Sequence, residues 1–113
     1  MTNIIPFENI SPAIDDSCFI AHNVIVTGDT HIGEDSNIWY GCVLRGDVDK
    51  IRIGKRTNIQ DLTMVHVSSF DNPAIIGDDV TIGHSAVIHA CEIKNGAFVG
   101  MQSCIMDGAV IEE

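Results

Sequence analysis

The amino-acid sequence predicts an all-β protein, a single-stranded parallel β-helix built from six-residue repeats. Aliphatic residues recur at every sixth position, glycine often follows them, and a small or β-branched residue lies four positions after them. A six-residue step does not keep to one face of a 3.6-residue helix, whereas it suits a short strand followed by a turn. The aliphatic series is Ile14, Ile20, Val26, Ile32, Ile38, Leu44, Ile53, Ile59, Val65, Ile76, Ile82, Ile88, Ile93, Val99, Ile105 and Ile111.

Three repeats bring the chain back over itself, so one coil takes about 18 residues and coils stack at the strand spacing of about 4.8 Å. Each inward residue then lies over its equivalent in the preceding coil, as Ile32 lies over Ile14, and its burial stabilises the fold by about 1.5–3 kcal/mol. Residues 1–113 form one domain, with a lead-in over 1–13 and coils over 14–31, 32–52, 53–75, 76–92 and 93–110. Insertions in GDVDKIR and SSFDNPA are expected at the corners, where inserted loops carry function.

Composition limits the partners that the chain can have. Its formal net charge of −10 argues against nucleic acid and anionic membranes, because both require basic patches. No apolar run approaches the ~20 residues that span a bilayer. The N-terminus resembles neither a secretory signal nor a transit peptide, so we expect a cytoplasmic location. The cysteines form no CxxC pair and are interpreted as reduced apolar fillers; they are Cys18, Cys42, Cys91 and Cys104.

Two of the five histidines fall on one outward column of the predicted β-helix. His66 and His89 each follow an inward aliphatic residue of the same face, in consecutive coils. We therefore expect their rings to stack about one strand spacing, ~4.8 Å, apart and to point outward. Arg45 lies in the same column, one coil before His66.

A third histidine lies on a different face. His84 is expected above Asp61, with Gln60 as its neighbour. Ligand nitrogens must lie ~2.0–2.1 Å from a metal ion, which His66 and His89 of one chain can achieve together but His84 of that chain cannot. A neighbouring subunit would supply the third imidazole, and such a contact closes into a homotrimer with interfacial sites.

The remaining histidines, His22 and His31, are interpreted as ordinary polar surface residues. For the other three, a competing interpretation is that outward histidines serve only the packing of a trimer. The sequence patterns alone leave both interpretations open.

The segment LRGDVDKIRIGKRTNIQDLTMVHV, followed by IGHSAVIHAC, resembles the γ-class carbonic anhydrases of the hexapeptide-repeat family. The resemblance rests on Arg45-Gly46-Asp47, Asn58-Ile59-Gln60-Asp61, His66, Gly83-His84 and His89. It implies a left-handed β-helix and a homotrimer with a metal between subunits, zinc first and iron or cobalt otherwise. The implied ligands are His66, His84 and His89. It further implies an Arg45–Asp61 ion pair across the interface, with Asp47 and Gln60 ordering solvent near the metal.

The activity that this resemblance implies is the reversible hydration of carbon dioxide to bicarbonate. Three neutral imidazoles leave the metal its charge and an open position, and the metal lowers the pKa of bound water to about 7. The resulting hydroxide attacks carbon dioxide, with Gln60 orienting it and Arg45 supplying positive charge. A purely structural clamp at the corner loop is the alternative for Arg45 and Asp47.

The sequence departs from the pattern of that group in two respects. Val48 follows Asp47, and the loop VSSFDNPAII contains no glutamate that could export protons rapidly. We also expect no C-terminal helix after the last coil, which would then present an unpaired strand edge. Two alternatives therefore stay open: a non-catalytic trimeric metal-binding or scaffold protein, and a hexapeptide-repeat acyltransferase with a histidine as general base.

Overall fold

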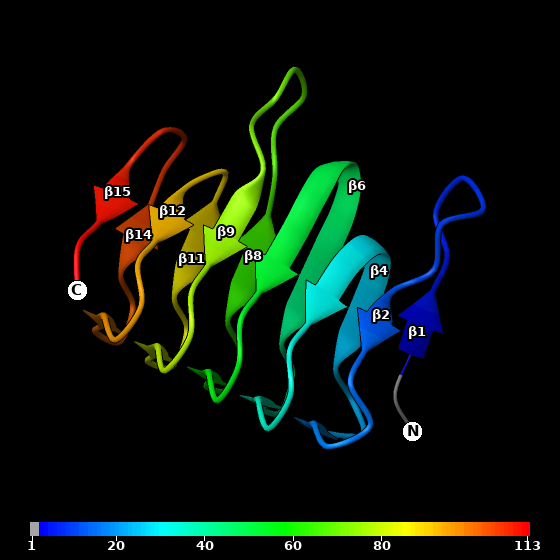
Figure 1. The fold of residues 1–113 in the computed structure, drawn as a ribbon, viewed down its shortest axis with the longest axis horizontal. Helices are drawn as coiled ribbons and strands as arrows, with labels where there is room; N and C mark the ends of the chain where they lie inside the picture. Colours follow the sequence, from blue (N-terminus) through cyan, green and yellow to red (C-terminus); the bar gives the residue numbers. More distant parts are fainter. Residues whose placement is uncertain (1–2) are drawn as a thin grey trace.

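The computed structural model describes residues 3–113, and it is a parallel β-helix with three faces (Figure 1). The first face contains β2 (Ala13–Ile14), the second halves of β4 (Ile25–Ile32) and β6 (Val43–Ile53), then β9 (Ala74–Ile76), β12 (Glu92–Ile93) and β15 (Val110–Ile111). The second face contains β3 (Phe19–Ile20), β5 (Asn37–Ile38), β7 (Asn58–Ile59), β10 (Thr81–Ile82) and β13 (Phe98–Val99). The third face contains β1 (Asn3–Ile5), the first halves of β4 and β6, then β8 (Met64–His66), β11 (Val87–His89) and β14 (Cys104–Ile105).

The register between coils follows the six-residue spacing of the sequence. Ile14 pairs with Ile32 on the first face, and Ile20 pairs with Ile38 on the second. All of the strand pairs are parallel, as the coil arrangement requires. The predicted stacking of inward aliphatic residues is therefore confirmed.

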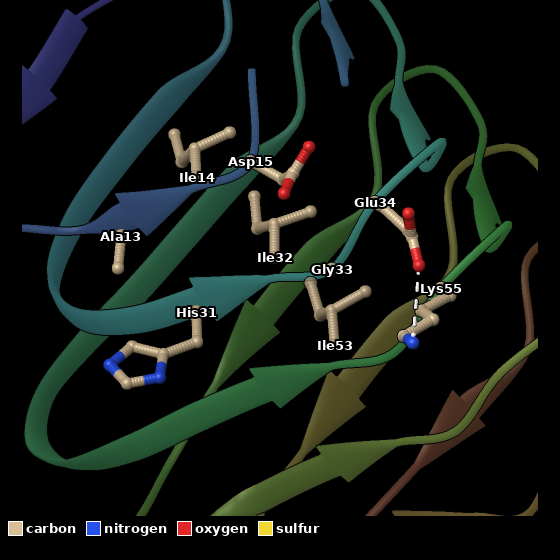
Figure 2. A pocket seen from close by; sticks show the side chains of 9 residues that line it. All are labelled: Ala13, Ile14, Asp15, His31, Ile32, Gly33, Glu34, Ile53 and Lys55. Carbon is tan, nitrogen blue, oxygen red and sulfur yellow. Dashed lines mark ion pairs between the residues drawn. The ribbon is translucent and has the colours of Figure 1, made fainter. Parts of the chain in front are cut away.

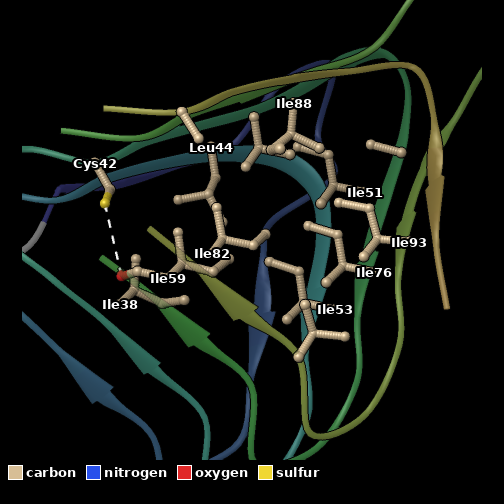
Figure 3. Close-up of a cluster of buried hydrophobic side chains, with 14 of the residues drawn as sticks. Ile38, Cys42, Leu44, Ile51, Ile53, Ile59, Ile76, Ile82, Ile88 and Ile93 are labelled. Carbon is tan, nitrogen blue, oxygen red and sulfur yellow. Dashed lines mark hydrogen bonds between the residues drawn. The ribbon is translucent and has the colours of Figure 1, made fainter. Parts of the chain in front are cut away.

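The inward residues of the three faces meet in one hydrophobic core (Figure 3). Ile38, Ile59 and Ile82 form its second-face column, and each is fully buried. Burying a side chain of this size stabilises the fold by about 1.5–3 kcal/mol. The core is continuous along the stack, so each coil is stabilised by the coils on either side of it.

The cysteines divide into two kinds. Cys42 and Cys91 are buried in the core, and burial raises the pKa of the Cys91 thiol to about 11. Cys104 is exposed instead, because it lies on an outward position of β14. Cys18 is partly buried and packs against the core. The interpretation as apolar fillers therefore holds for Cys18, Cys42 and Cys91 but is wrong for Cys104.

The first coils turn the corner between the third and first faces without a separate loop. Here β4 and β6 run round the corner as continuous strands, with a register shift between Gly28 and Thr30 (Figure 1). Gly28 has φ +73°, and a Cβ at this position would collide with the carbonyl oxygen of Gly46. Glycine is needed there because the backbones of two coils approach closely in a conformation that L side chains rarely adopt.

Both predicted insertions lie at this same corner. The first, within GDVDKIR, lengthens β6. The second, within SSFDNPA, lies in the loop of residues 67–73, which projects between β8 and β9 (Figure 1). A bridge between Ser68 and Asn72 closes the second loop. The Phe70 side chain at its tip is 95% exposed.

The N-terminal lead-in contributes to the β-helix. β1 pairs with β4, with Asn3 opposite Ile25 and Ile5 opposite Thr27, and so adds a row to the third face. Residues 1 and 2 of the lead-in lie outside the described part of the chain. Among residues 3–113 there is no helix that is long and apolar enough to span a membrane.

Candidate metal centre

His66 and His89 lie side by side on the third face, at the ends of β8 and β11. The two residues are partners in the strand register, and their ring centroids are 5.1 Å apart. Nδ1 of His66 lies 3.2 Å from Nε2 of His89. The side chains are only 16% and 26% exposed, so the pair is partly shielded from solvent. The pairing predicted from the sequence is confirmed.

Each of these histidines has a carboxylate on its other ring nitrogen. Asp47, from the first insertion, places Oδ1 2.9 Å from Nε2 of His66. Asp107, from the turn between β14 and β15, places Oδ1 2.6 Å from Nδ1 of His89. A ring nitrogen that donates to a carboxylate leaves the second nitrogen with a lone pair. The two remaining nitrogens, Nδ1 of His66 and Nε2 of His89, are the ones that face each other.

Arg45 supports this arrangement from the same outward column. It is the register partner of His66, and its guanidinium donates to Oδ2 of Asp47 at 2.8 Å. Burial acts to raise the pKa of Asp47, but the Val48 amide, His66 and Arg45 together lower it. Asp47 is therefore an ionised acceptor that contacts both Arg45 and His66, which fits the clamp interpretation of Arg45 and Asp47.

His84 is held on the second-face side of the β-helix, as predicted. Its Nδ1 lies 3.2 Å from Oδ1 of Asp61, and the two side chains are 51% and 36% exposed. Within residues 3–113 no group of three histidine, cysteine, aspartate or glutamate side chains could hold a metal ion. The three predicted ligands thus do not converge within one chain. The Arg45–Asp61 pair across subunits stays a prediction, and within the chain these residues contact Asp47 and His84 respectively.

Gln60 is oriented by a row of amide side chains along the second face. Its Nε2 donates to Oδ1 of Asn58 at 2.9 Å, and the Asn58 amide donates in turn to Asn37. The Trp39 indole also donates to Asn37, at 2.8 Å. Gln60 therefore uses its amide nitrogen within the row and keeps its carbonyl oxygen as the group that can accept a further proton donor.

Asp107 was not found from the sequence. It lies 18 residues after His89, one coil further along, and its second oxygen accepts from the Ser68 hydroxyl at 2.6 Å. The hydrogen bonds from Ser68 and His89 lower the pKa of Asp107. The coil period could have placed Asp107 above His89, but only the turn conformation decides that its carboxylate reaches the ring.

A hollow of about 680 Å³ lies along the first face (Figure 2). Its lining comes from the first three coils: Ala13, Ile14, Asp15, His31, Ile32, Gly33, Glu34, Ile53 and Lys55. Lys55 and Glu34 form an ion pair of 3.1 Å across it. None of the predicted site residues lines this hollow.

Comparison with known proteins identifies the family to which this fold belongs. The family model described as bacterial transferase hexapeptide (six repeats) matches residues 11–46. The chain is 52% identical over 108 residues to the Arabidopsis thaliana protein named "Gamma carbonic anhydrase 2, mitochondrial", covering 91% of the chain and 39% of that protein. The chain spans between 37% and 60% of the length of the curated relatives that it matches.

Two solved structures are similar over nearly the whole chain. A hexapeptide transferase family protein from Anaplasma phagocytophilum has a TM-score of 0.94 at 52% identity, over 98% of this chain and 64% of that one. A putative acetyltransferase from Bacillus cereus has a TM-score of 0.85 at 37% identity, over 98% of this chain and 74% of that one.

The fold defines a solenoid of six-residue repeats, and the likeness to these structures confirms that it is the left-handed parallel β-helix. The chain belongs to the hexapeptide-repeat family, in which it is a γ-carbonic anhydrase-like member.

Proposed function

We propose that this chain is a metal-binding subunit of a homotrimer that hydrates carbon dioxide reversibly to bicarbonate. The observation that carries the proposal is the His66–His89 pair, in which one nitrogen of each ring meets a carboxylate and the other faces the partner ring. The similarity to a protein named as a γ-carbonic anhydrase supports the same reading.

The donor atoms fit a divalent transition metal. Two imidazole nitrogens bound to one tetrahedral ion at ~2.0–2.1 Å lie about 3.3 Å apart. The facing nitrogens of His66 and His89 are 3.2 Å apart. Carboxylates on the outer nitrogens of ligating histidines are the usual second partners in metal sites. Imidazole suits zinc first and iron or cobalt as well, so zinc is the metal that we propose.

The third ligand comes from a second chain in this proposal. His84 lies on the second-face side, half exposed and held by Asp61. A neighbouring subunit whose second face packs against this chain's third face brings His84 to the pair. Such a contact joins unlike surfaces, and it closes into a ring when the rotation is one third of a turn.

When bound, a metal with three neutral imidazole ligands keeps its full charge and an open position, and lowers the pKa of bound water to about 7. The chain's own residues do the rest. Gln60 of the chain that supplies His84, whose amide nitrogen is committed to Asn58, presents its carbonyl oxygen as an acceptor that orients the attacking group. Asp47 holds His66, and Arg45 holds Asp47 and contributes positive charge near the site of developing bicarbonate.

A non-catalytic metal-binding trimer is the second candidate. The observation in its favour is the composition of the corner beside the histidine pair. Position 48 is a valine and the loop at residues 67–73 contains no glutamate, so no glutamate at these positions can carry protons away from the site. An acyltransferase is supported by the name of the Bacillus cereus neighbour. A single general base, however, needs no second histidine at 3.2 Å from it.

One native mass spectrum of the purified chain, loaded with Zn²⁺, tests the metal and the assembly together. We expect a trimer with one ion per subunit, and a metal-free monomer would refute the proposal. His89→Ala, His66→Ala and His84→Ala should each lose the ion. His31→Gln is the matched control, because His31, like His84, is half exposed and its Nε2 lies 3.6 Å from an aspartate, Asp29.

Stopped-flow hydration of carbon dioxide then separates the enzyme from the non-catalytic protein. The zinc-loaded trimer should exceed the rate of buffer alone, and His89→Ala should return to that rate. A loaded trimer without any rate above buffer would identify the protein as a metal-binding or scaffold subunit.

A further inference from the structure

Asp107 is the one carboxylate at the histidine pair that the similarity-based assignment of the site does not include. It belongs to the fifth coil, whereas His89 belongs to the fourth and Ser68 to the inserted loop of the third. Its two oxygens bind different partners, Oδ1 the Nδ1 of His89 at 2.6 Å and Oδ2 the hydroxyl of Ser68 at 2.6 Å. The carboxylate is thereby fixed in position by three successive coils.

We propose that Asp107, anchored by Ser68, is a positioning residue that fixes His89 in the Nδ1–H tautomer and thereby directs Nε2 at the metal. This proposal rests on the metal site described above. A neutral imidazole has one donor and one acceptor nitrogen, and a hydrogen bond to one of them decides which is left to bind. Asp107 accepts a hydrogen bond from the Nδ1–H group of His89. The lone pair therefore stays on Nε2, the atom that faces His66.

The two histidines are oriented in opposite senses by their carboxylates. Asp47 binds Nε2 of His66, which leaves Nδ1 for the ion, whereas Asp107 binds Nδ1 of His89, which leaves Nε2. With both carboxylates in place, the two nitrogens that carry lone pairs, Nδ1 of His66 and Nε2 of His89, lie 3.2 Å apart. Without Asp107, His89 is free to carry its proton on Nε2, and an N–H then occupies the position where a ligand lone pair is required.

Ser68 is well placed as the second anchor. Its backbone amide donates to the Asn72 carbonyl at 3.1 Å, within the bridge that closes the inserted loop. The hydroxyl is therefore held by a structured loop, and Ser68 lies two residues after His66. Asp107 itself is 44% exposed, so replacing it removes little packing and leaves the core intact.

The test compares four variants of the whole chain: Asp107→Asn, Asp107→Ala, Ser68→Ala and Asp71→Asn. Asp71→Asn is the control, because it removes one negative charge from an exposed position of the same loop that already has positive φ, a conformation asparagine tolerates. Zn²⁺ affinity is measured by competition with a chromophoric chelator, at a protein concentration where native mass spectra show equal assembly. The His89 tautomer is read from its ¹⁵N ring shifts in the metal-free protein.

Loss of a second partner of a ligating histidine lowers metal affinity about 10–100-fold. We expect Asp107→Ala to fall in that range and Asp107→Asn to lose more, because an amide can donate to Nδ1 and so favour the wrong tautomer. Ser68→Ala should show a smaller loss, and Asp71→Asn none. The ¹⁵N shifts of His89 should report Nδ1–H in the wild type and Nε2–H in Asp107→Asn.

Wild-type affinity in both Asp107 variants would overturn the proposal, and so would a lowered affinity with an unchanged His89 tautomer. Failure of the wild-type chain itself to bind Zn²⁺ would instead refute the proposed function. The two failures are thus distinguished by the wild-type measurement alone.

Discussion

The backbone amide of Asn72 donates to the Asp49 carboxylate at 2.8 Å, which joins the two inserted segments of the β-helix. Asp49 belongs to the first insertion and Asn72 to the second, one coil later. The same corner carries Asp47 on the first segment and Ser68 on the second. The contact therefore holds together the two segments that orient His66 and, through Asp107, His89.

Replacing Asp49 by alanine should loosen the inserted loop. The variant loses the acceptor for the Asn72 amide and also that for the Lys50 amide. We expect faster hydrogen exchange at the Asn72 amide and a loss of about 0.5–1.5 kcal/mol in the free energy of unfolding. Asp49→Asn keeps an oxygen acceptor and is the matched control. Equal exchange rates in Asp49→Ala and the wild type would show that this contact does not hold the loop.

Replacing Ile59 by alanine should destabilise the whole stack. Ile59 is fully buried and pairs with Ile38 in the coil before and Ile82 in the coil after. A cavity at this position costs about 2–5 kcal/mol of unfolding free energy, measured by urea denaturation. Val48→Ala is the control, since Val48 is 52% exposed and should change stability by less than about 0.5 kcal/mol. Equal midpoints for the two variants would contradict the buried column.

Mixing two inactive variants should restore metal binding if the site is shared between chains. His84→Ala retains His66 and His89, whereas His89→Ala retains His84. Co-refolding equal amounts leaves about one quarter of the interfaces with a complete set of three histidines, if the chains combine at random in a trimer. Bound zinc per chain, measured after gel filtration, should rise from near zero to that fraction. No recovery in mixed trimers would contradict a site shared between two chains.

The Arg56–Asp79 pair should make stability depend on acidic pH. Arg56 donates to both oxygens of Asp79, at 2.8 and 3.1 Å, and these hydrogen bonds lower the pKa of Asp79. Because the folded pKa lies below the unfolded value of about 3.9, the pair stabilises the fold above that pH and its contribution is lost as the pH falls through the folded pKa. Asp79→Asn should therefore lower Tm slightly at pH 7.

That difference in Tm should shrink below about pH 4 and disappear once Asp79 is protonated in the folded chain. Both side chains are exposed, so the effect is small and is further reduced by salt. Asp35→Asn is the control, since Asp35 also has positive φ and its carboxylate makes no ion pair among residues 3–113. A Tm difference that stays constant from pH 7 to pH 3 would contradict the assignment.

The coil architecture and the histidine pair could be predicted from the sequence for one physical reason. A one-residue slip would turn every inward side chain outward, so the spacing of the aliphatic residues determines the register. Once Val65 is known to lie against Ile88, His66 and His89 must be neighbours. The separation of His84 onto another face follows from the same register.

The carboxylate partners of the His66–His89 pair could not be predicted in the same way, because they lie at corners. Arg45 contacts Asp47 of its own chain at 2.8 Å, and this contact depends on how the first insertion bends. Asp107 reaches His89 through a turn whose conformation the six-residue spacing does not specify. The cytoplasmic location, the homotrimer and the roles of Gln60 and Asp61 stay predictions.

In the proposed trimer, where His84 of one chain completes a site on another, retention of the metal would depend on the protein concentration. A ligand that binds only the assembled state shifts the assembly equilibrium by mass action, and reciprocally dilution of the subunits weakens its hold. An ion shared by two chains would therefore stabilise the contact between them. Depletion of the metal in a cell would, on that basis, also favour dissociation of the subunits.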